Sequence, residues 1–163
     1  MKPDQIVLEE VCPRLEQINL QKMRFGLGLG LISSEFITEG QIISSFADAP
    51  VVSERTYLSV QVSETEDVDD PYVLARLNHS CDPNVFVDAE KRHVEALKDI
   101  EVGTVLTFFY PQTEWHMSSP FDCHCKADAC LGSINGAEFL RAEQLAGFKI
   151  SPHIQRLIQQ RDN

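Results

Sequence analysis

The sequence predicts a mainly β fold of short strands joined by tight turns, with short helices and a helical tail at the C-terminal end. Short runs of alternating apolar and polar residues, bounded by Gly, Pro, Asn and Asp, recur between residues 29 and 110. Helical spacing of apolar residues dominates only after Pro120. With 163 residues the chain has the size of one ordinary domain.

The composition, 43% apolar and 24% charged, is typical of a soluble globular protein. No apolar run approaches the roughly 20 residues that span a bilayer. The first residues show neither a signal-peptide core nor an Arg-rich transit pattern. The sequence therefore indicates an intracellular protein without a membrane partner.

The charge balance is strongly acidic, with 25 Asp and Glu against 14 Lys and Arg and a formal charge of −11. This balance disfavours direct binding to nucleic acid, which depends on contacts from Lys and Arg to phosphate. It would attract a cationic substrate, less strongly as salt rises. Five cysteines, an odd number, favour metal binding over a disulfide scaffold.

A weakly amphipathic leader, residues 6–20, precedes alternating glycines at Gly26, Gly28 and Gly30. Such glycines allow a ligand or another strand to approach the backbone closely. The following residues predict strands at 29–33 and 41–46 around a turn. A dinucleotide-binding loop is excluded, because Ser33 replaces the third glycine and no helix follows.

The run 57–62 alternates as a strand does, and the next residues, 64–70, are rich in acids. The acidic run is either a solvated loop or an acidic wall beside a site for a basic peptide. Asp70 followed by Pro71 resembles an N-cap, which predicts a short helix at 71–77.

This helix leads into Asn78-His79-Ser80-Cys81, four consecutive residues that carry a carboxamide, an imidazole, a hydroxyl and a thiol. Strands are predicted at 85–87, 92–97 and 104–110, the last ending at Pro111. So much polar chemistry between apolar segments indicates a functional site, although a turn that satisfies its own hydrogen bonds is the alternative for Asn78 and His79.

Downstream, Cys123, Cys125 and Cys130 place three thiols within eight positions, and helices are predicted at 137–146 and 152–160. A structural zinc site needs four ligands, so a fourth must come from elsewhere in the chain. The alternative is a set of reduced thiols, with His116 or His124 as a ligand. Cys12 is expected to be a buried small apolar residue.

Four motifs in order resemble a SET-domain protein-lysine methyltransferase with a C-terminal post-SET zinc module. They are Gly28-Leu29-Gly30-Leu31 with Ile37-x-x-Gly40-x-Ile42, Leu77–Asn84, Gly103-x-x-Leu106-Thr107-Phe108-Phe109-Tyr110, and Cys123-x-Cys125-x4-Cys130-x-Gly132. The resemblance implies small curved sheets with a knot-like crossing, divided into a SET domain with leader (1–120), a post-SET module (121–136) and a helical extension (137–163).

The resemblance also implies methyl transfer from S-adenosyl-L-methionine to the ε-amine of a lysine in a basic protein or peptide, with Zn²⁺ as a second cofactor. It names the metal ligands as Cys81, Cys123, Cys125 and Cys130. It names the cofactor-binding residues as Gly28, Leu29, Gly30, Asn78 and His79. It names Tyr110 as the catalytic tyrosine, with Phe108 and Tyr57 as further channel aromatics; for Tyr110 and Tyr57, ordinary packing within a strand is the alternative.

The chain departs from the family pattern at Phe109, where Asp is frequent, and at Thr104-Val105, where Glu pairs are frequent. It has no pre-SET cysteine module, since Cys12 alone lies upstream of the core. The alternatives in function are an enzyme acting on a small molecule and a non-catalytic module that binds the cofactor or a peptide. Phe108 in place of tyrosine leaves room for a second methyl group, so multiple methylation is expected.

Overall fold

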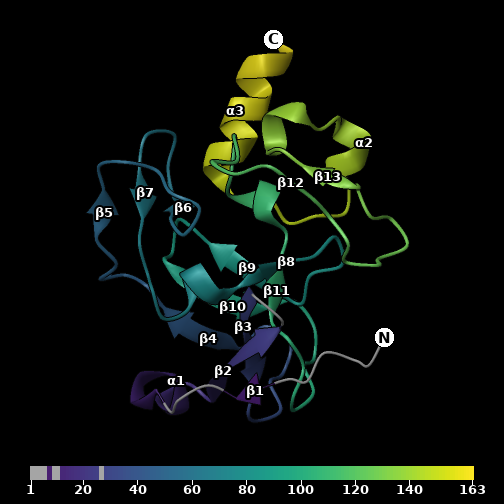
Figure 1. The fold of residues 1–163 in the computed structure, drawn as a ribbon. Coiled ribbons are helices and arrows are strands. Elements are labelled where there is room, and N and C mark those ends of the chain that lie inside the picture. Colours follow the sequence, from purple (N-terminus) through teal and green to yellow (C-terminus); the bar gives the residue numbers. More distant parts are fainter. Residues whose placement is uncertain (1–6, 9–11, 26–27) are drawn as a thin grey trace.

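The computed structural model describes residues 7–8, 12–25 and 28–163. Residues 1–5, residues 6 and 9–11 of the leader, and Gly26 and Leu27 of the glycine-rich stretch lie outside the described residues. The described residues form five small sheets joined by turns and loops, and the helices are short except for the last (Figure 1). The expected mainly β class with a C-terminal helical tail is confirmed.

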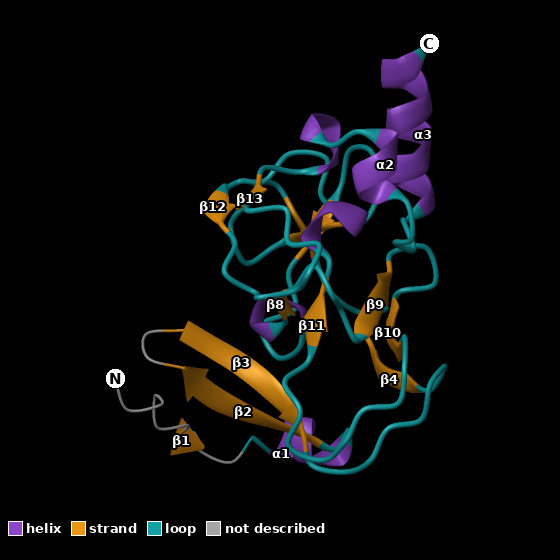
Figure 2. Cartoon of the chain, turned by 90° about the vertical axis from the view of Figure 1, so that its right-hand side faces the viewer, coloured by secondary structure: helices purple, strands orange, loops and turns teal. Residues whose placement is uncertain are grey.

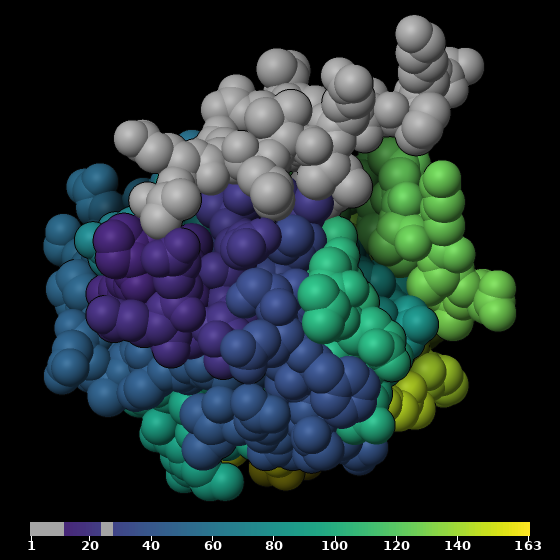
Figure 3. Space-filling view, turned by 90° about the horizontal axis from the view of Figure 1, so that it is seen from below, coloured from purple at the N-terminus to yellow at the C-terminus, as the bar shows by residue number. Residues whose placement is uncertain are grey.

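The first sheet is antiparallel and contains β1 (Val7–Leu8), β2 (Leu20–Phe25) and β3 (Gly28–Ser33). Figure 2 shows β2 and β3 as a long hairpin at one side of the molecule, with α1 (Pro13–Gln17) at its open end. Seen from below, the early part of the described chain forms most of the surface, and the yellow C-terminal residues reach only its edge (Figure 3).

The central sheet places β10 (His93–Ala96) between β4 (Ile42–Ser45) and β9 (Val85–Asp88), both antiparallel to it. All four residues of β9 are buried. This burial explains why β9 reads as a continuous apolar run rather than an alternating one. A third sheet has the order β5 (Val51–Val52), β7 (Asp67–Val68), β6 (Val60–Gln61).

Two further pairs bring distant parts of the chain together. β8 (Asn78–His79) pairs in parallel with β11 (Thr107–Phe108). These strands belong to the two segments that were expected to cross, and here they lie side by side. β12 (Phe121–Asp122) pairs with β13 (Ser133–Ile134) and closes the loop that carries the three downstream cysteines.

The helices after the sheets form a C-terminal layer. They are a 3-10 helix at Ala137–Phe139, α2 (Ala142–Leu145) and α3 (Pro152–Asp162). α3 docks through the completely buried Ile154, and His153 Nε2 donates to Thr113 O at 2.9 Å. Across the described residues, helices fall short of the length and apolar character that crossing a bilayer requires.

Phe109 explains one departure from the family pattern. Its side chain is completely buried and stacks on Phe148, with ring centroids 3.7 Å apart and an interplanar angle of 7°. Leu140 and Leu145 complete this small cluster. An apolar residue here therefore anchors the C-terminal layer to the strand that leads to Tyr110.

Three predicted elements are shorter than expected. The strand predicted at 57–62 is reduced to Val60–Gln61, because Thr56 and Ser59 form local hydrogen bonds that bend the chain. The strand at 104–110 is reduced to Thr107–Phe108, followed by a 3-10 helix at Tyr110–Gln112. The helix predicted at 71–77 is reduced to a 3-10 helix at Leu74–Arg76, whose N-cap is Val73 and not Asp70. Asp70 Oδ1 instead accepts from the backbone N–H of Tyr72, at 3.0 Å, in the turn that precedes this helix.

Candidate functional site

The polar segment 78–81 is held against the strand that precedes Tyr110. Asn78 is opposite Thr107 and His79 opposite Phe108 in the parallel pair. Asn84 fixes this arrangement, because its side chain accepts from Thr107 N at 2.9 Å and donates to Val105 O at 2.8 Å. The fold thus converts two segments far apart in sequence into one rigid unit.

Tyr110 stands at the centre of this unit. Its hydroxyl donates to Leu77 O at 2.8 Å, and its backbone N–H donates to His79 Nδ1 at 3.2 Å. Burial, with a contribution from the charge of Glu114, raises the pKa of the phenol well above its usual range. The hydroxyl therefore stays protonated and acts as a donor.

His79 links Tyr110 to the cysteines. Burial lowers the pKa of its imidazole to about 4, so the ring is neutral at physiological pH. Since Nδ1 accepts from Tyr110, the ring proton lies on Nε2, 3.4 Å from Cys81 Sγ. A shift in the position of Cys81 would therefore reach Tyr110 through the His79 ring.

A cavity of about 470 Å³ opens beside this unit. Asn78, His79 and Tyr110 line it, and none of the described residues hydrogen-bonds to the Asn78 side chain. The remaining lining comes from Tyr57 and from the segment leading into the cysteines, namely Met117, Ser118, Ser119, Phe121, Cys123, His124 and Cys125. The cavity combines aromatic walls with an available carboxamide, which suits a ligand with a flat ring and a polar end.

A second, much smaller cavity of about 40 Å³, called the narrow cavity below, also has Tyr110 in its lining. Its walls include Leu77, Phe108 and Glu114. Tyr57, Tyr110, Met117 and Ser118 line both cavities. Tyr110 therefore belongs to the walls of both the larger and the narrow cavity, an arrangement that can bring two reactants together beside this side chain.

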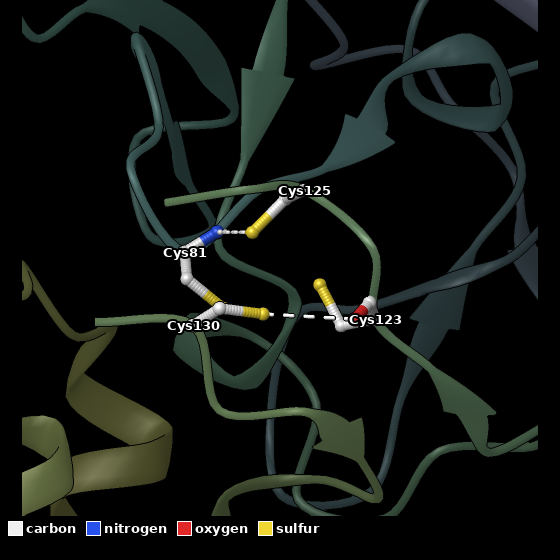
Figure 4. A group of neighbouring side chains, drawn as sticks. All are labelled: Cys81, Cys123, Cys125 and Cys130. Atoms are coloured by element: carbon white, nitrogen blue, oxygen red, sulfur yellow. Dashed lines mark hydrogen bonds between the residues drawn. The ribbon is translucent and has the colours of Figure 1, made fainter. Parts of the chain in front are cut away.

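The four cysteines form a compact group behind the larger cavity. The sulfurs of Cys81, Cys123, Cys125 and Cys130 all lie within 4.8 Å of one another, and Figure 4 shows their side chains converging from two separate segments. A tetrahedral Zn–S site with bonds of about 2.3 Å places its sulfurs about 3.8 Å apart. The donor set and the spacing therefore fit a metal ion with a preference for thiolate.

Backbone N–H groups support this cluster. Cys81 N–H points to Cys125 Sγ and Leu131 N–H points to Cys81 Sγ, both at 3.5 Å. Burial raises the pKa of the Cys81 thiol to about 11. A metal would be needed to hold that sulfur as thiolate.

The structure brings together most of the residues that the sequence indicated. Asn78, His79, Tyr110 and Tyr57 share the larger cavity, and Tyr57, Phe108 and Tyr110 share the narrow one. Tyr57 is 76% exposed, so it forms an outer rim rather than a buried wall. The histidines proposed as alternative metal ligands lie outside the cysteine group: His124 lines the larger cavity, and His116 pairs with Glu138.

The glycine-rich residues lie apart from these walls. Gly28, Leu29 and Gly30 belong to β3, opposite Phe25, Arg24 and Met23 of β2, and they are absent from the lining of both cavities. Phe121 and Glu114 were not foreseen from the sequence. The place of Phe121, two residues before Cys123, was an available signal, whereas nothing in the sequence around Glu114 distinguishes it.

Comparison with known proteins gives a consistent result. A family model described as SET domain matches residues 28–111. The chain is 36% identical over 121 residues to a methyltransferase named flvH from Aspergillus flavus, covering 73% of this chain and 68% of that protein.

Two histone enzymes are more distant. The identity is 32% over 111 residues with an H3 lysine-36 specific histone-lysine N-methyltransferase of Aspergillus oryzae, which covers 63% of this chain but only 11% of that enzyme. The methyltransferase domain of human histone-lysine N-methyltransferase SETMAR has a similar fold, with a TM-score of 0.50 and 21% identity over 69% of this chain and 56% of that one.

Proposed function

Because the chain belongs to the SET-domain methyltransferase family, we propose that it transfers a methyl group from S-adenosyl-L-methionine to the ε-amine of a lysine in a protein. The observation that supports this proposal is that Tyr110 lines two cavities of very different volume. The larger would receive the cofactor and the narrow one a single unbranched side chain.

In the larger cavity, each wall has a separate task. Phe121 and His79, whose rings lie 5.7 Å apart, offer surfaces for a nucleoside base. The free carboxamide of Asn78 is available for the amino-acid end. When bound, S-adenosyl-L-methionine supplies a methyl group activated by its sulfonium charge.

In the narrow cavity, aromatic and aliphatic walls align the substrate side chain with Tyr110. Phe108 and Tyr110, with ring centroids 4.7 Å apart, confine an alkyl chain. The Tyr110 hydroxyl donates to the carbonyl oxygen of Leu77, another residue of this wall, and this bond fixes the orientation of the hydroxyl. Holding the reacting atoms in line supplies a large share of the acceleration in such transfers.

The cysteine group is proposed to hold one Zn²⁺ as a structural site. Four thiolates and no open position are typical of structural zinc rather than catalytic zinc. The site would fasten residues 123–130 to Cys81, and so hold Phe121 over the larger cavity.

The test is methyl transfer from labelled S-adenosyl-L-methionine to a pool of random peptides centred on lysine, analysed by mass spectrometry. We expect methyl groups on ε-amines and a loss on the order of 100-fold or more in Tyr110→Phe. Calorimetry with S-adenosyl-L-methionine should show that this variant still binds the cofactor.

The alternative of a small-molecule substrate is tested in parallel with n-butylamine, the reactive end of lysine without its peptide. Transfer to n-butylamine but to no peptide in the pool would favour a small substrate. Cofactor binding without transfer to either would contradict the proposed activity and favour a binding module.

A further inference from the structure

Glu114 is a buried carboxyl in the wall of the narrow cavity, and the function proposed so far gives it no role. It is 6% exposed and shares this wall with Phe108 and Tyr110. It follows Tyr110 by four residues, and its backbone N–H donates to Tyr110 O at 3.0 Å. Among the residues that line this cavity it is the one carboxyl group.

The orientation of this carboxyl is fixed. Oε1 accepts from the backbone N–H of Gln61 at 2.9 Å and from the Thr113 hydroxyl at 3.2 Å. Gln61 in turn accepts from Trp115 N–H through its side chain at 3.0 Å. Because these hydrogen bonds fix the carboxyl group through Oε1, the position of Oε2 is fixed as well.

The charges around Glu114 leave it without a cation of its own. Arg55 faces it but is engaged by Asp67 through several hydrogen bonds of 3.0–3.2 Å. His153 of α3 is turned to Thr113 O. Burial first, and then the charge of Asp67, raises the pKa of Glu114 to about 7, against the lowering effects of the Gln61 hydrogen bond and of Arg55.

The proposed reaction needs a group with these properties. A lysine side chain is an ammonium ion in water, with a pKa of about 10.4, and it cannot attack a methyl group until it loses a proton. Tyr110 is unsuited to accept that proton, because its hydroxyl is a donor and its pKa is raised. A carboxyl that is ionised near neutral pH can both attract the cation and accept the proton.

We infer that Glu114 draws the substrate ammonium into the narrow cavity and accepts its proton before methyl transfer, which makes alkylammonium compounds the substrate class. This inference rests on the proposed function. An N–H bond of the ammonium breaks, its electron pair stays on nitrogen, and the proton passes to a Glu114 oxygen. The nitrogen lone pair then bonds the methyl carbon while the carbon–sulfur bond breaks onto sulfur, and Glu114 later returns its proton to solvent.

The test is the pH dependence of methyl transfer by Glu114→Gln, with the lysine peptide pool as substrate. The amide has the same size, and its oxygen can still accept from Gln61 N–H. At about pH 7 we expect a rate lower by a factor on the order of 100. By about pH 10 the rate should approach that of the unchanged protein, because the amine then loses its proton to solvent.

Two further variants complete the experiment. Glu114→Asp keeps a carboxyl and should recover part of the rate at about pH 7. Glu101→Gln removes one exposed charge in a turn remote from the cavities and should leave the rate unchanged.

The outcomes separate this inference from the proposed function. An unchanged profile in Glu114→Gln, or an equal loss at every pH, would overturn the role of Glu114 alone. If the unchanged protein methylates no amine at all, the proposed function fails and the inference fails with it. Thermal unfolding and cofactor binding of each variant show whether it is folded.

Discussion

Phe108 lies beside Tyr110 in the wall of the narrow cavity, where one added hydroxyl reduces the room available to the proposed substrate nitrogen. In Phe108→Tyr, we expect the product to shift toward monomethyl-lysine, because the new hydroxyl can hold a water molecule where a second methyl group would lie. Mass spectrometry of the products over time checks this. If the unchanged protein forms only monomethyl product, the idea is wrong.

Glu114 also predicts a dependence of stability on pH. Its pKa is raised in the folded protein from 4.5 to about 7, so the folded state binds more protons than the unfolded state between these values. Stability therefore falls as pH rises through this window, by about 3 kcal/mol from this group.

The measurement is urea unfolding of the unchanged protein and Glu114→Gln at about pH 5 and about pH 8. The difference between the two proteins isolates this carboxyl from other titrating groups. The Gln variant should gain in relative stability at the higher pH. If the free energy of unfolding changes equally with pH in the two proteins, the pKa of Glu114 is not raised in the folded state.

At this scale the sequence predicted part of the site. The sequence predicted that Asn78, His79 and Tyr110 belong to one site, because they lie in motifs that the family resemblance places next to each other. Glu114 could not, since its burial depends on a hydrogen bond to Gln61, 53 positions away. Such a partner leaves no local pattern in the residues around either position.

Among the larger elements, the segment around Gly136 controls how Glu114 and Trp115 are placed. Gly136 has φ of +119°, and a Cβ there would lie 2.3 Å from Trp115 O. Ala137 N–H donates to Glu114 O at 2.9 Å, so the two segments run close together. Only glycine permits this approach.

We therefore expect Gly136→Ala to destabilise the protein by well over 1 kcal/mol and to lower methyl transfer. Gly103→Ala is the matched control, since Gly103 also has positive φ but no atom within 4 Å of the added Cβ. Gly103→Ala should lose less stability than Gly136→Ala, because it adds only the strain of a positive φ and no steric clash. Urea unfolding of both variants checks this, and equal losses would refute the importance of the contact.

Two elements that the sequence predicted too long end early for different physical reasons. The helical pattern at 137–146 is interrupted because Arg161 donates to the carbonyls of Glu138 and Leu140, at 2.8 and 2.9 Å, which a continuous helix would use internally. The strand predicted to reach Tyr110 ends early because the chain turns there. A long-range partner thus overrode local preference in the helical segment, whereas the strand ends at a local 3-10 turn, Tyr110–Gln112.

For the whole molecule, the cysteine group predicts dependence on metal. We expect one zinc ion per chain, and a fall in Tm of about 10 °C or more after chelation, because such sites contribute several kcal/mol and about 1 kcal/mol corresponds to about 2–4 °C in a domain of this size. Cys81→Ser should resemble the chelated protein and bind the cofactor weakly.

Cys12→Ser provides the control for the metal experiment. Cys12 packs against the main core and is not part of the cysteine group. This variant should keep its zinc and its response to chelation. Full stability in the absence of any metal would show that the four thiols are held by packing alone.

The architecture as a whole was predictable because four motifs in order specify it, and the order of strands within sheets was not. Nothing local indicates that β10 lies between β4 and β9, or that β7 lies between β5 and β6. These arrangements follow from which apolar faces are buried together. The C-terminal layer was foreseen as helical, and its anchor at Phe109 became visible only in three dimensions.

The hydrogen bond from Tyr110 to Leu77 joins positions 33 residues apart, and the parallel strands beside it join the same two segments. Closing so long a stretch costs entropy before any contact offsets it. We expect this junction to assemble late in refolding. No excised peptide could reproduce it, so an attempt to graft the activity onto another scaffold would have to transfer the entire intervening chain.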